Sequence, residues 1–131
     1  MTPESTRYLD KAAQCLSNAR AVLGINLAND AGRNAYFAVF HAAQALIFER
    51  TGKISKSHNG VQSQFAVIVK NEPNIDESFV IFLSQAYILK AVADYETGLG
   101  STIRSDRAAA AIEMAEKFLD CIRDVLPKTS P

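Results

Sequence analysis

One segment of the chain combines apolar helix-forming residues with polar groups that could handle a phosphate or a proton. Residues 35–46 are rich in alanine and aromatic side chains at helical spacing, yet His41 stands in their middle, and Arg33, Asn34 and Tyr36 come before it. Asn34 and His41 are seven residues apart and therefore share one face of a helix. A neutral histidine can accept a proton while an arginine binds phosphate, which would suit phosphodiester cleavage or nucleotide binding. The alternative is a buried histidine hydrogen-bonded to a neighbouring helix, because an unsatisfied buried polar group costs about 1–3 kcal/mol.

Ser57 and His58 form a second polar cluster at the end of a basic loop and the start of an expected helix. Free backbone N–H groups at a helix start favour an anion, so these residues are candidates for binding one. Capping of the helix by Ser57 or Asn59 explains the same residues without a ligand.

A third cluster contains Lys90, Asp94 and Tyr95 at the end of an apolar helix. Lys90 and Asp94 are four residues apart, close enough to form an intrahelical salt bridge. Three polar tips at the edge of an apolar helix are equally typical of a binding site. Both interpretations stay open at this point.

The sequence predicts no metal site and no cofactor. The two histidines are seventeen residues apart, and neither is followed by a carboxylate three or four residues later. The phosphate-binding, dinucleotide-binding and serine-hydrolase signatures rich in glycine are all missing from the sequence.

The overall charge does not indicate a general nucleic-acid binder, since 14 basic residues balance 14 acidic ones in a chain of 131 residues. The distribution is uneven. Residues 50–70 hold four bases, one histidine and no acid, whereas residues 71–98 hold five acids and one lysine. The basic segment could meet phosphate or could be a solvated surface loop.

Cysteine use and hydropathy favour a cytoplasmic protein without a membrane role. Cys15 and Cys121 lie at apolar helical positions without metal-binding spacing, so we expect reduced thiols. The start of the chain is polar and acidic, unlike a secretory signal. The longest apolar run, residues 79–93, is too short to span a bilayer and contains Lys90.

The 3.6-residue period of apolar positions predicts an all-α protein of five helices and no sheet. We expect one domain over residues 1–126 with a tail at 127–131, folded as an antiparallel up-and-down four-helix bundle with one extra short helix. The apolar helix at 77–96 is expected to be the central one. The expected helices are 3–24, 30 to 49 or 50, 60–69, 77–96 and 105–125, joined in part by loops at 52–59 and 98–101.

Local signals mark where these helices begin and end. Thr2 is expected to cap the first helix and Gly24 to close it. Asp30 is expected to cap the second helix, which Gly52 would end in a left-handed conformation. Ser105 or Asp106 is expected to cap the last.

Four ordered segments resemble small prokaryotic proteins of the HEPN domain family. Residues 35–43, AYFAVFHAA, are similar to the family's AYYAMFHAA segment, and residues 57–61, SHNGV, to its THKGV loop. Residues 90–95, KAVADY, are similar to RxxADY, and residues 115–119, AEKFL, to the closing AxxFv. The resemblance covers nearly the whole chain.

This resemblance implies a helical bundle that forms a homodimer and associates with RNA or nucleotides, often beside a small nucleotidyltransferase in a toxin–antitoxin or defence module. Many relatives are ribonucleases whose site is an arginine followed four to six residues later by a histidine, paired across the dimer. Here Lys90 stands at the arginine position, and Asp94 and Tyr95 stand near the histidine position. Lysine is a point charge rather than a planar fork, and aspartate repels phosphate, so cleavage by that motif is not expected.

Our leading hypothesis is therefore a HEPN protein that binds RNA, a nucleotide or a partner nucleotidyltransferase. Its two alternatives are a metal-independent endoribonuclease with a rearranged site, in which His41 and Lys90 are catalytic, and a structural adaptor. Lys90 and Arg33 would meet phosphate, while Asp94 and Tyr95 would orient the histidines. The expected ligand-binding residues are Arg33, Asn34, Tyr36, Ser57, His58, Asp94 and Tyr95.

Overall fold

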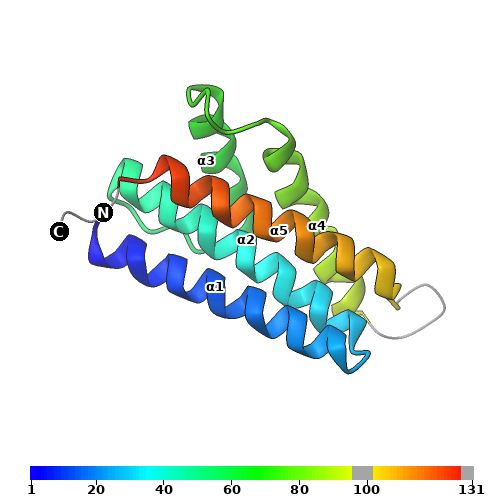
Figure 1. Cartoon of the computed structure of the whole chain (residues 1–131). Helices are drawn as coiled ribbons and strands as arrows, with labels where there is room; N and C mark the ends of the chain where they lie inside the picture. Colours follow the sequence, from blue (N-terminus) through cyan, green and yellow to red (C-terminus); the bar gives the residue numbers. More distant parts are fainter. Residues whose placement is uncertain (96–101, 128–131) are drawn as a thin grey trace.

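The computed structural model describes residues 1–95 and 102–127, which form five helices and contain no strand (Figure 1). The helices α1 and α4 run in one direction and α2 and α5 in the other, with the short α3 set between α2 and α4. This confirms the predicted all-α bundle. The expected loop at 98–101, and all but the first residue of the expected tail at 127–131, lie outside the described residues. The helices are α1 (Pro3–Gly24), α2 (Ala28–Thr51), α3 (His58–Lys70), α4 (Ser78–Asp94) and α5 (Ser105–Val125).

Two of the expected helix signals are confirmed by the backbone. The Thr2 hydroxyl accepts the N–H of Ser5 at 3.2 Å, with Pro3 in the first turn of α1. Gly52 follows α2 with φ 72°, a left-handed conformation that favours glycine. A third signal is confirmed as well, since α1 ends at Gly24, and the left-handed residue that follows is Asn26 at φ 65°.

Two expected caps are wrong. The N-cap of α2 is Leu27, which makes no side-chain cap bond, and Asp30 lies inside the first turn, where its carboxylate binds Arg33. The N-cap of α5 is Arg104, and the expected cap Asp106 instead accepts the Arg104 guanidinium at 3.1 Å. Asp30 binds the Arg33 side chain, whereas Asp106 accepts both the Arg104 guanidinium and the backbone N–H of Arg107 from within the first turn.

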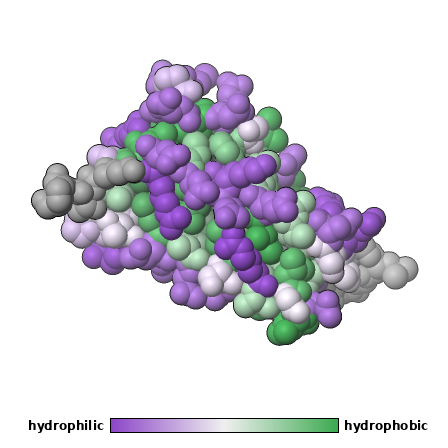
Figure 2. All heavy atoms as spheres, in the orientation of Figure 1, coloured by the Kyte–Doolittle hydropathy of each residue, from purple (hydrophilic) through white to green (hydrophobic). Residues whose placement is uncertain are grey.

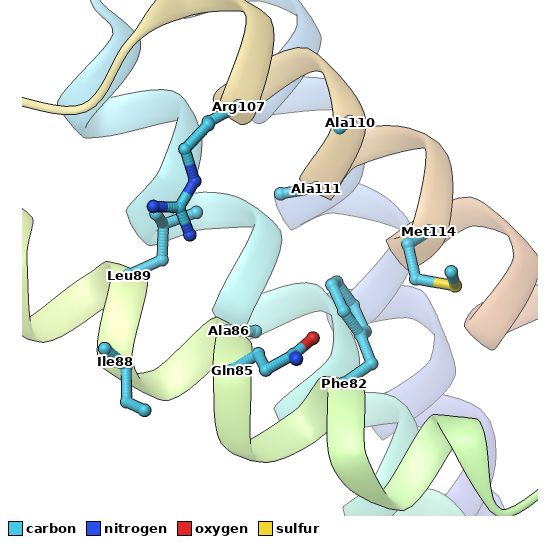
Figure 3. A pocket seen from close by; sticks show the side chains of 9 residues that line it. All are labelled: Phe82, Gln85, Ala86, Ile88, Leu89, Arg107, Ala110, Ala111 and Met114. Carbon is cyan, nitrogen blue, oxygen red and sulfur yellow. The ribbon is translucent and has the colours of Figure 1, made fainter.

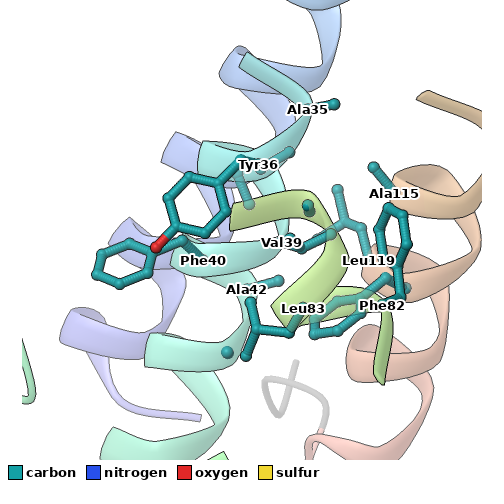
Figure 4. Close-up of a cluster of buried hydrophobic side chains, with 14 of the residues drawn as sticks. Ala35, Tyr36, Val39, Phe40, Ala42, Phe82, Leu83, Ala115 and Leu119 are labelled. Carbon is teal, nitrogen blue, oxygen red and sulfur yellow. The ribbon is translucent and has the colours of Figure 1, made fainter. Parts of the chain in front are cut away.

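The central helix is α2, and the prediction that the apolar helix at 77–96 is central was wrong. Helices α1, α3, α4 and α5 all pack against α2. Its alanines let the neighbouring backbones come close, and side chains from α2, α4 and α5 meet in one core (Figure 4). Six alanines of α2 are completely buried: Ala31, Ala35, Ala38, Ala42, Ala43 and Ala45.

Helix α4 keeps one apolar side turned away from this core. Its Phe82, Leu83 and Leu89 are buried, whereas Ile81 is 58% exposed and Ile88 is 60% exposed. The apolar sequence of α4 therefore predicted burial on more than one side, but the described residues bury only one side of this helix.

The face of the molecule in Figure 2 is largely hydrophilic, with hydrophobic side chains visible between the polar ones. None of the helices has the length and hydropathy that crossing a bilayer requires, within residues 1–95 and 102–127. Cys15 and Cys121 are both free thiols and partly buried, and burial raises the pKa of each.

Candidate functional site

Aromatic residues from three helices gather around His58 at the start of α3. Its imidazole stacks on the Tyr87 ring of α4 with a centroid distance of 3.5 Å, and its Nδ1 lies 3.1 Å from the Tyr36 hydroxyl of α2. Lys90, one turn after Tyr87, places its Nζ 5.8 Å from the centroid of the Phe37 ring. We call Tyr36, Phe37, His58, Tyr87 and Lys90 the His58 cluster.

The local structure explains how His58 reaches this position. Gly52 turns the chain back at the end of α2, and the loop 52–57 then runs along α2 to Ser57, whose hydroxyl caps α3 by accepting the Gly60 N–H at 3.0 Å. The structure thus confirms that Ser57 caps this helix. Cap and loop together bring His58 to the Tyr36 side of α2.

Burial keeps the hydrogen-bonding groups of this cluster neutral. Burial, and then the nearby Lys90 ammonium, lowers the pKa of His58. Burial, and then the adjacent Tyr87 phenol, raises the pKa of Tyr36. The protonated phenol can therefore donate to Nδ1 of a neutral imidazole, which leaves the ring's own proton on Nε2.

Arg33 belongs to an ion-pair network at the end of α4. Its Nε lies 2.9 Å from Asp94 Oδ1, its Nη1 binds Asp30, and its Nη2 donates to the carbonyl of Ala93 at 3.2 Å. The other Asp94 oxygen binds Lys90. Hydrogen bonds from Lys90 and then from Arg33 lower the pKa of Asp94, so this carboxylate is ionised at neutral pH.

This network has two consequences for the predicted ligand-binding residues. Two cations, Arg33 and Lys90, face two carboxylates, Asp30 and Asp94, so the group carries no net charge. A phosphate would have to compete with the Asp94 carboxylate, which already bridges both cations. The sequence-predicted pair of Lys90 and Asp94 is thus a salt bridge that is extended by Arg33.

His41 has a separate environment on the α1 side of α2. Its Nδ1 lies 2.7 Å from Gln44 Oε1, and Gln44 Nε2 donates to the carbonyl of Ser55 at 2.8 Å. Because the amide nitrogen of Gln44 faces Ser55, its oxygen faces His41, and the imidazole must carry its proton on Nδ1. Burial, opposed by the Gln44 hydrogen bond and assisted by Lys11, lowers the pKa of His41.

The Phe37 ring lies next to both His41 and the His58 cluster. The centroids of His41 and Phe37 are 6.1 Å apart in a stacked arrangement, and Lys90 lies over the same Phe37 ring. His41 also stacks on Tyr8 of α1 at 6.5 Å. The expected catalytic pair, His41 and Lys90, therefore shares a neighbour but makes no direct hydrogen bond within the described residues.

Two further predicted residues lie at the margin of this site. Asn34 donates to the Asp30 carbonyl of its own helix at 2.9 Å. Tyr95 follows Asp94 at the end of α4, and its side chain is 74% exposed. Neither residue forms part of the stacked His58 cluster.

Sequence reasoning missed Tyr87, Phe37 and Gln44. Tyr87 precedes Lys90 by three residues and Gln44 follows His41 by three, so helical spacing alone could have paired each with its neighbour. Gln62, one turn after His58 on α3, was missed as well. Its Oε1 is buried and accepts no hydrogen bond from the part of the chain that the structure describes.

The loop before α3 carries positive charge that is not neutralised locally. Lys53 and Lys56 are exposed and form no ion pair with any residue in 1–95 or 102–127. Arg50, at the end of α2, binds Glu72 at 3.3 Å. The net positive field in this region therefore comes from the two lysines of the loop.

An apolar groove lies between α4 and α5, outside the site (Figure 3). Phe82, Ala86 and Leu89 of α4 face Ala111 and Met114 of α5, and Arg107 extends over one end of the groove beside Leu89. None of the sequence-predicted site residues lines it. No group of three or more potential metal ligands occurs among the described residues.

Comparison with known proteins agrees with this architecture. The HEPN domain matches residues 5–125. The chain is also 32% identical over 123 residues to a protein of Methanocaldococcus jannaschii named "Putative toxin MJ0605", a match that covers 94% of this chain and 89% of that protein. The family match spans nearly the whole chain, α1 to α5. The chain belongs to the HEPN domain family.

Proposed function

We propose that this protein is the HEPN member of a toxin–antitoxin-type module and that it binds single-stranded RNA at the His58 cluster. The name of its archaeal relative supports the toxin–antitoxin assignment. The ligand assignment depends on the chemistry of the cluster.

The stacked pair of His58 and Tyr87 is the observation that carries the proposal. Tyr87 is 36% exposed, and its ring is held in place by His58 on one side and by Tyr36 at 5.6 Å. A fixed and partly exposed aromatic ring is a platform for an unpaired base, worth about 1–3 kcal/mol per base. Double-stranded nucleic acid keeps its bases stacked internally and cannot use such a platform.

Positive charge near the platform supports a nucleic-acid ligand. The unpaired Lys53 and Lys56 lie in the loop that leads to His58, whereas the charge of Lys90 in the cluster is balanced by Asp94. Ammonium groups of this kind attract phosphates without reading sequence. The neutral overall charge of the chain means that this attraction is local.

The same residues argue for binding rather than cleavage. The family's cleavage motif needs an arginine and a histidine, and here Lys90 and Asp94 occupy those places and neutralise each other. Asp94 is ionised and directly repels the phosphate that would be attacked. A homodimer, a nucleotidyltransferase partner and a cytoplasmic location complete the proposal, on the basis of the family resemblance.

Fluorescence anisotropy with a labelled single-stranded RNA octamer tests the proposal. Tyr87→Ala should weaken binding roughly fivefold or more, whereas Tyr87→Phe, which keeps the ring, should bind like the wild type. Lys90→Ala should also weaken binding, while Lys117→Ala, an exposed lysine of α5, should not. Absence of RNA binding by the folded wild type at tens of micromolar would exclude the proposed ligand. If the protein binds ATP or AMP under those conditions, the proposed ligand is a mononucleotide and not RNA.

A metal-independent endoribonuclease is the second candidate function. It is favoured by the Lys90 ammonium beside the two histidines, which could steady a phosphate; because His58 already accepts the Tyr36 hydroxyl at Nδ1, the proton acceptor would be His41. His41 also keeps Nε2 as an acceptor, since Gln44 occupies its Nδ1 and no described residue hydrogen-bonds Nε2.

RNA cleavage in EDTA separates the two functions. Under the binding proposal the wild type leaves RNA intact. Cleavage that disappears in His58→Ala or His41→Ala and in Lys90→Ala would establish the enzyme instead. A folded protein that neither binds nor cuts RNA would be left with the adaptor role.

A further inference from the structure

The way in which α4 and α5 pack leaves a groove between them. Each of these helices packs on α2, and the two scarcely touch one another. The groove has a volume of about 370 Å³, and no residue of the His58 cluster lines it (Figure 3). Neighbouring helices of a bundle normally fill such a gap with their own side chains. Here the gap stays open, and we call it the α4–α5 groove.

The lining of the α4–α5 groove combines small and large apolar side chains. Ala86 of α4 and Ala111 of α5 are small and buried. Phe82 and Leu89 of α4 and Met114 of α5 are the larger residues around them. Small residues let another helix backbone come close, while the larger residues beside them pack between its side chains. The lining therefore suits the apolar stripe of an α-helix.

The α4–α5 groove is an open trough and not an enclosed cavity. Gln85 and Ile88 of α4 and Ala110 of α5 line it, and all three are exposed. A small molecule in an open trough would keep much of its surface in water, whereas sites for small ligands bury most of the ligand. An amphipathic helix needs to bury only one stripe when it binds in a groove. The open shape therefore favours a polypeptide.

The charge at one end of the groove defines the occupant further. Arg107 extends over this end beside Leu89 and forms no ion pair with any residue that the structure describes (Figure 3). The adjacent Asp106 binds Arg104 instead. Arg107 also stands in the first turn of α5, and a helix start carries positive partial charge. A carboxylate on the occupant would complement both, and no acidic side chain among the described residues lines the groove.

We propose that the α4–α5 groove binds an amphipathic α-helix of a partner protein, whose apolar stripe lies in the groove and whose aspartate or glutamate pairs with Arg107. Phe82 and Leu89 are seven residues apart, so the groove accepts about 10 Å of helix, or two turns. The stripe then consists of three apolar residues, at positions i, i+3 or i+4, and i+7. The acidic residue lies one turn beyond the stripe. No residue of the His58 cluster takes part, so this interaction does not depend on RNA binding.

Two labelled helical peptides test the charge at the groove end. Both carry three leucines at this spacing on an alanine-rich background, followed one turn later by glutamate in one peptide and by lysine in the other. In anisotropy titrations the wild type should bind the glutamate peptide roughly fivefold more tightly. Arg107→Glu should reverse this preference, because it reverses the sign of the charge. Arg123→Glu, at an exposed arginine near the other end of α5, is the matched control and should keep the wild-type preference.

A second pair of variants tests whether the peptide lies in the groove. Ala110→Phe adds a large side chain to the exposed α5 side of the groove and should weaken binding of the glutamate peptide roughly tenfold. Ala21→Phe makes the same change at an exposed alanine of α1 and should leave the affinity unchanged. Both variants should keep the helical circular dichroism of the wild type, since neither alanine belongs to the buried core.

The proposal is overturned if the folded wild type does not bind the glutamate peptide at about 1 mM, or binds both peptides equally. Equal losses in Ala110→Phe and Ala21→Phe would overturn it too. So would displacement of the peptide by an equal concentration of decanoate, which would assign the groove to a small anionic amphiphile. A lower molar mass of Ala110→Phe than of the wild type in light scattering would assign the groove to a second copy of this chain and contradict the proposal.

Discussion

The two histidines of this protein lie in contrasting surroundings. His41 donates its hydrogen bond to the amide oxygen of Gln44, a residue of the same helix, which is itself 5% exposed. His58 is held by Tyr36 from α2 and by Tyr87 from α4, so three helices must assemble before its position exists. The hydrogen bond of His41 is local to its helix, whereas the contacts of His58 come from two other helices; both histidines are partly buried.

This difference separates a structural role from a ligand-binding one. A polar group that is satisfied within its own helix and beneath a loop mainly stabilises the fold. His58 is fixed between helices and stacks on a partly exposed ring, that of Tyr87. A ligand can replace the solvent on the exposed ring. The contrast predicts which variants will affect stability and which will affect binding.

The largest expected effect is on stability at the His41 side. Gln44→Leu keeps the volume but leaves the His41 Nδ1–H and the Ser55 carbonyl without their partner, which should lower the free energy of unfolding by about 2–3 kcal/mol. Urea denaturation measures the change. Gln14→Leu is the control, because Gln14 is exposed on α1 and bonds only Asn18, and it should change stability by less than about 0.5 kcal/mol. Equal losses in the two variants would show that Gln44 has no special role.

A smaller effect is expected when the tertiary support of His58 is removed. Tyr36→Phe deletes the hydroxyl bonded to Nδ1 and should cost about 1 kcal/mol of stability together with a loss of RNA affinity. Tyr8→Phe is the matched control beside His41. Tyr8 contacts His41 through its ring, so loss of the hydroxyl should change neither the stability nor the RNA affinity. A Tyr36→Phe protein with full RNA affinity would mean that the orientation of His58 is irrelevant to binding.

Asp94 limits the affinity of the site for anions. Asp94→Asn removes the carboxylate that bridges Arg33 and Lys90, so RNA binding should tighten roughly twofold to fivefold, which corresponds to about 0.5–1 kcal/mol for partly exposed charges. Anisotropy titrations at low salt measure the change, with the exposed Asp10→Asn as control. Weaker binding by Asp94→Asn would assign Asp94 to the ligand contact instead.

The smallest expected effect is a pH dependence of stability. Folding lowers the pKa of both histidines below the value of about 6.5 that histidine has in the unfolded chain. As the pH falls below that value, the unfolded chain therefore binds more protons than the folded protein does. Stability should be level above pH 7.5 and decrease between pH 6.5 and 5.5. His41→Gln should flatten this decrease in urea midpoints, since it removes one titrating group. An unchanged slope in His41→Gln would show that His41 does not contribute.

Much of the fold could be predicted from the sequence because it depends on local patterns. The spacing of apolar residues predicted all five helices, and Thr2, Gly52 and Ser57 marked their ends correctly. Asp30 and Asp106 failed as caps because each helix begins before them, at the N-caps Leu27 and Arg104, so both acids lie inside the first turn. Hydropathy could not show that one apolar side of the helix at 77–96 stays exposed in this chain, which is why that helix was wrongly expected to be central.

The candidate site could be predicted only in part, because local sequence patterns do not determine contacts between different helices. The pair Lys90 and Asp94 follows from helical spacing, and the structure contains it. The stack of His58 on Tyr87 joins residues from two helices whose relative placement no local rule provides. Arg33 and Asp94 are 61 positions apart in the sequence, so the hydrogen-bonded ion pair between them could not be predicted from local spacing.

The hydrogen bond from Gln44 to the carbonyl of Ser55 makes His41 a reporter of the neighbouring loop. Only the docked loop fixes the amide so that the imidazole keeps its proton on Nδ1, and a released loop lets the amide turn and the tautomers mix. The nitrogen chemical shifts of one side chain would therefore record, in a single spectrum, whether the segment that delivers His58 is seated.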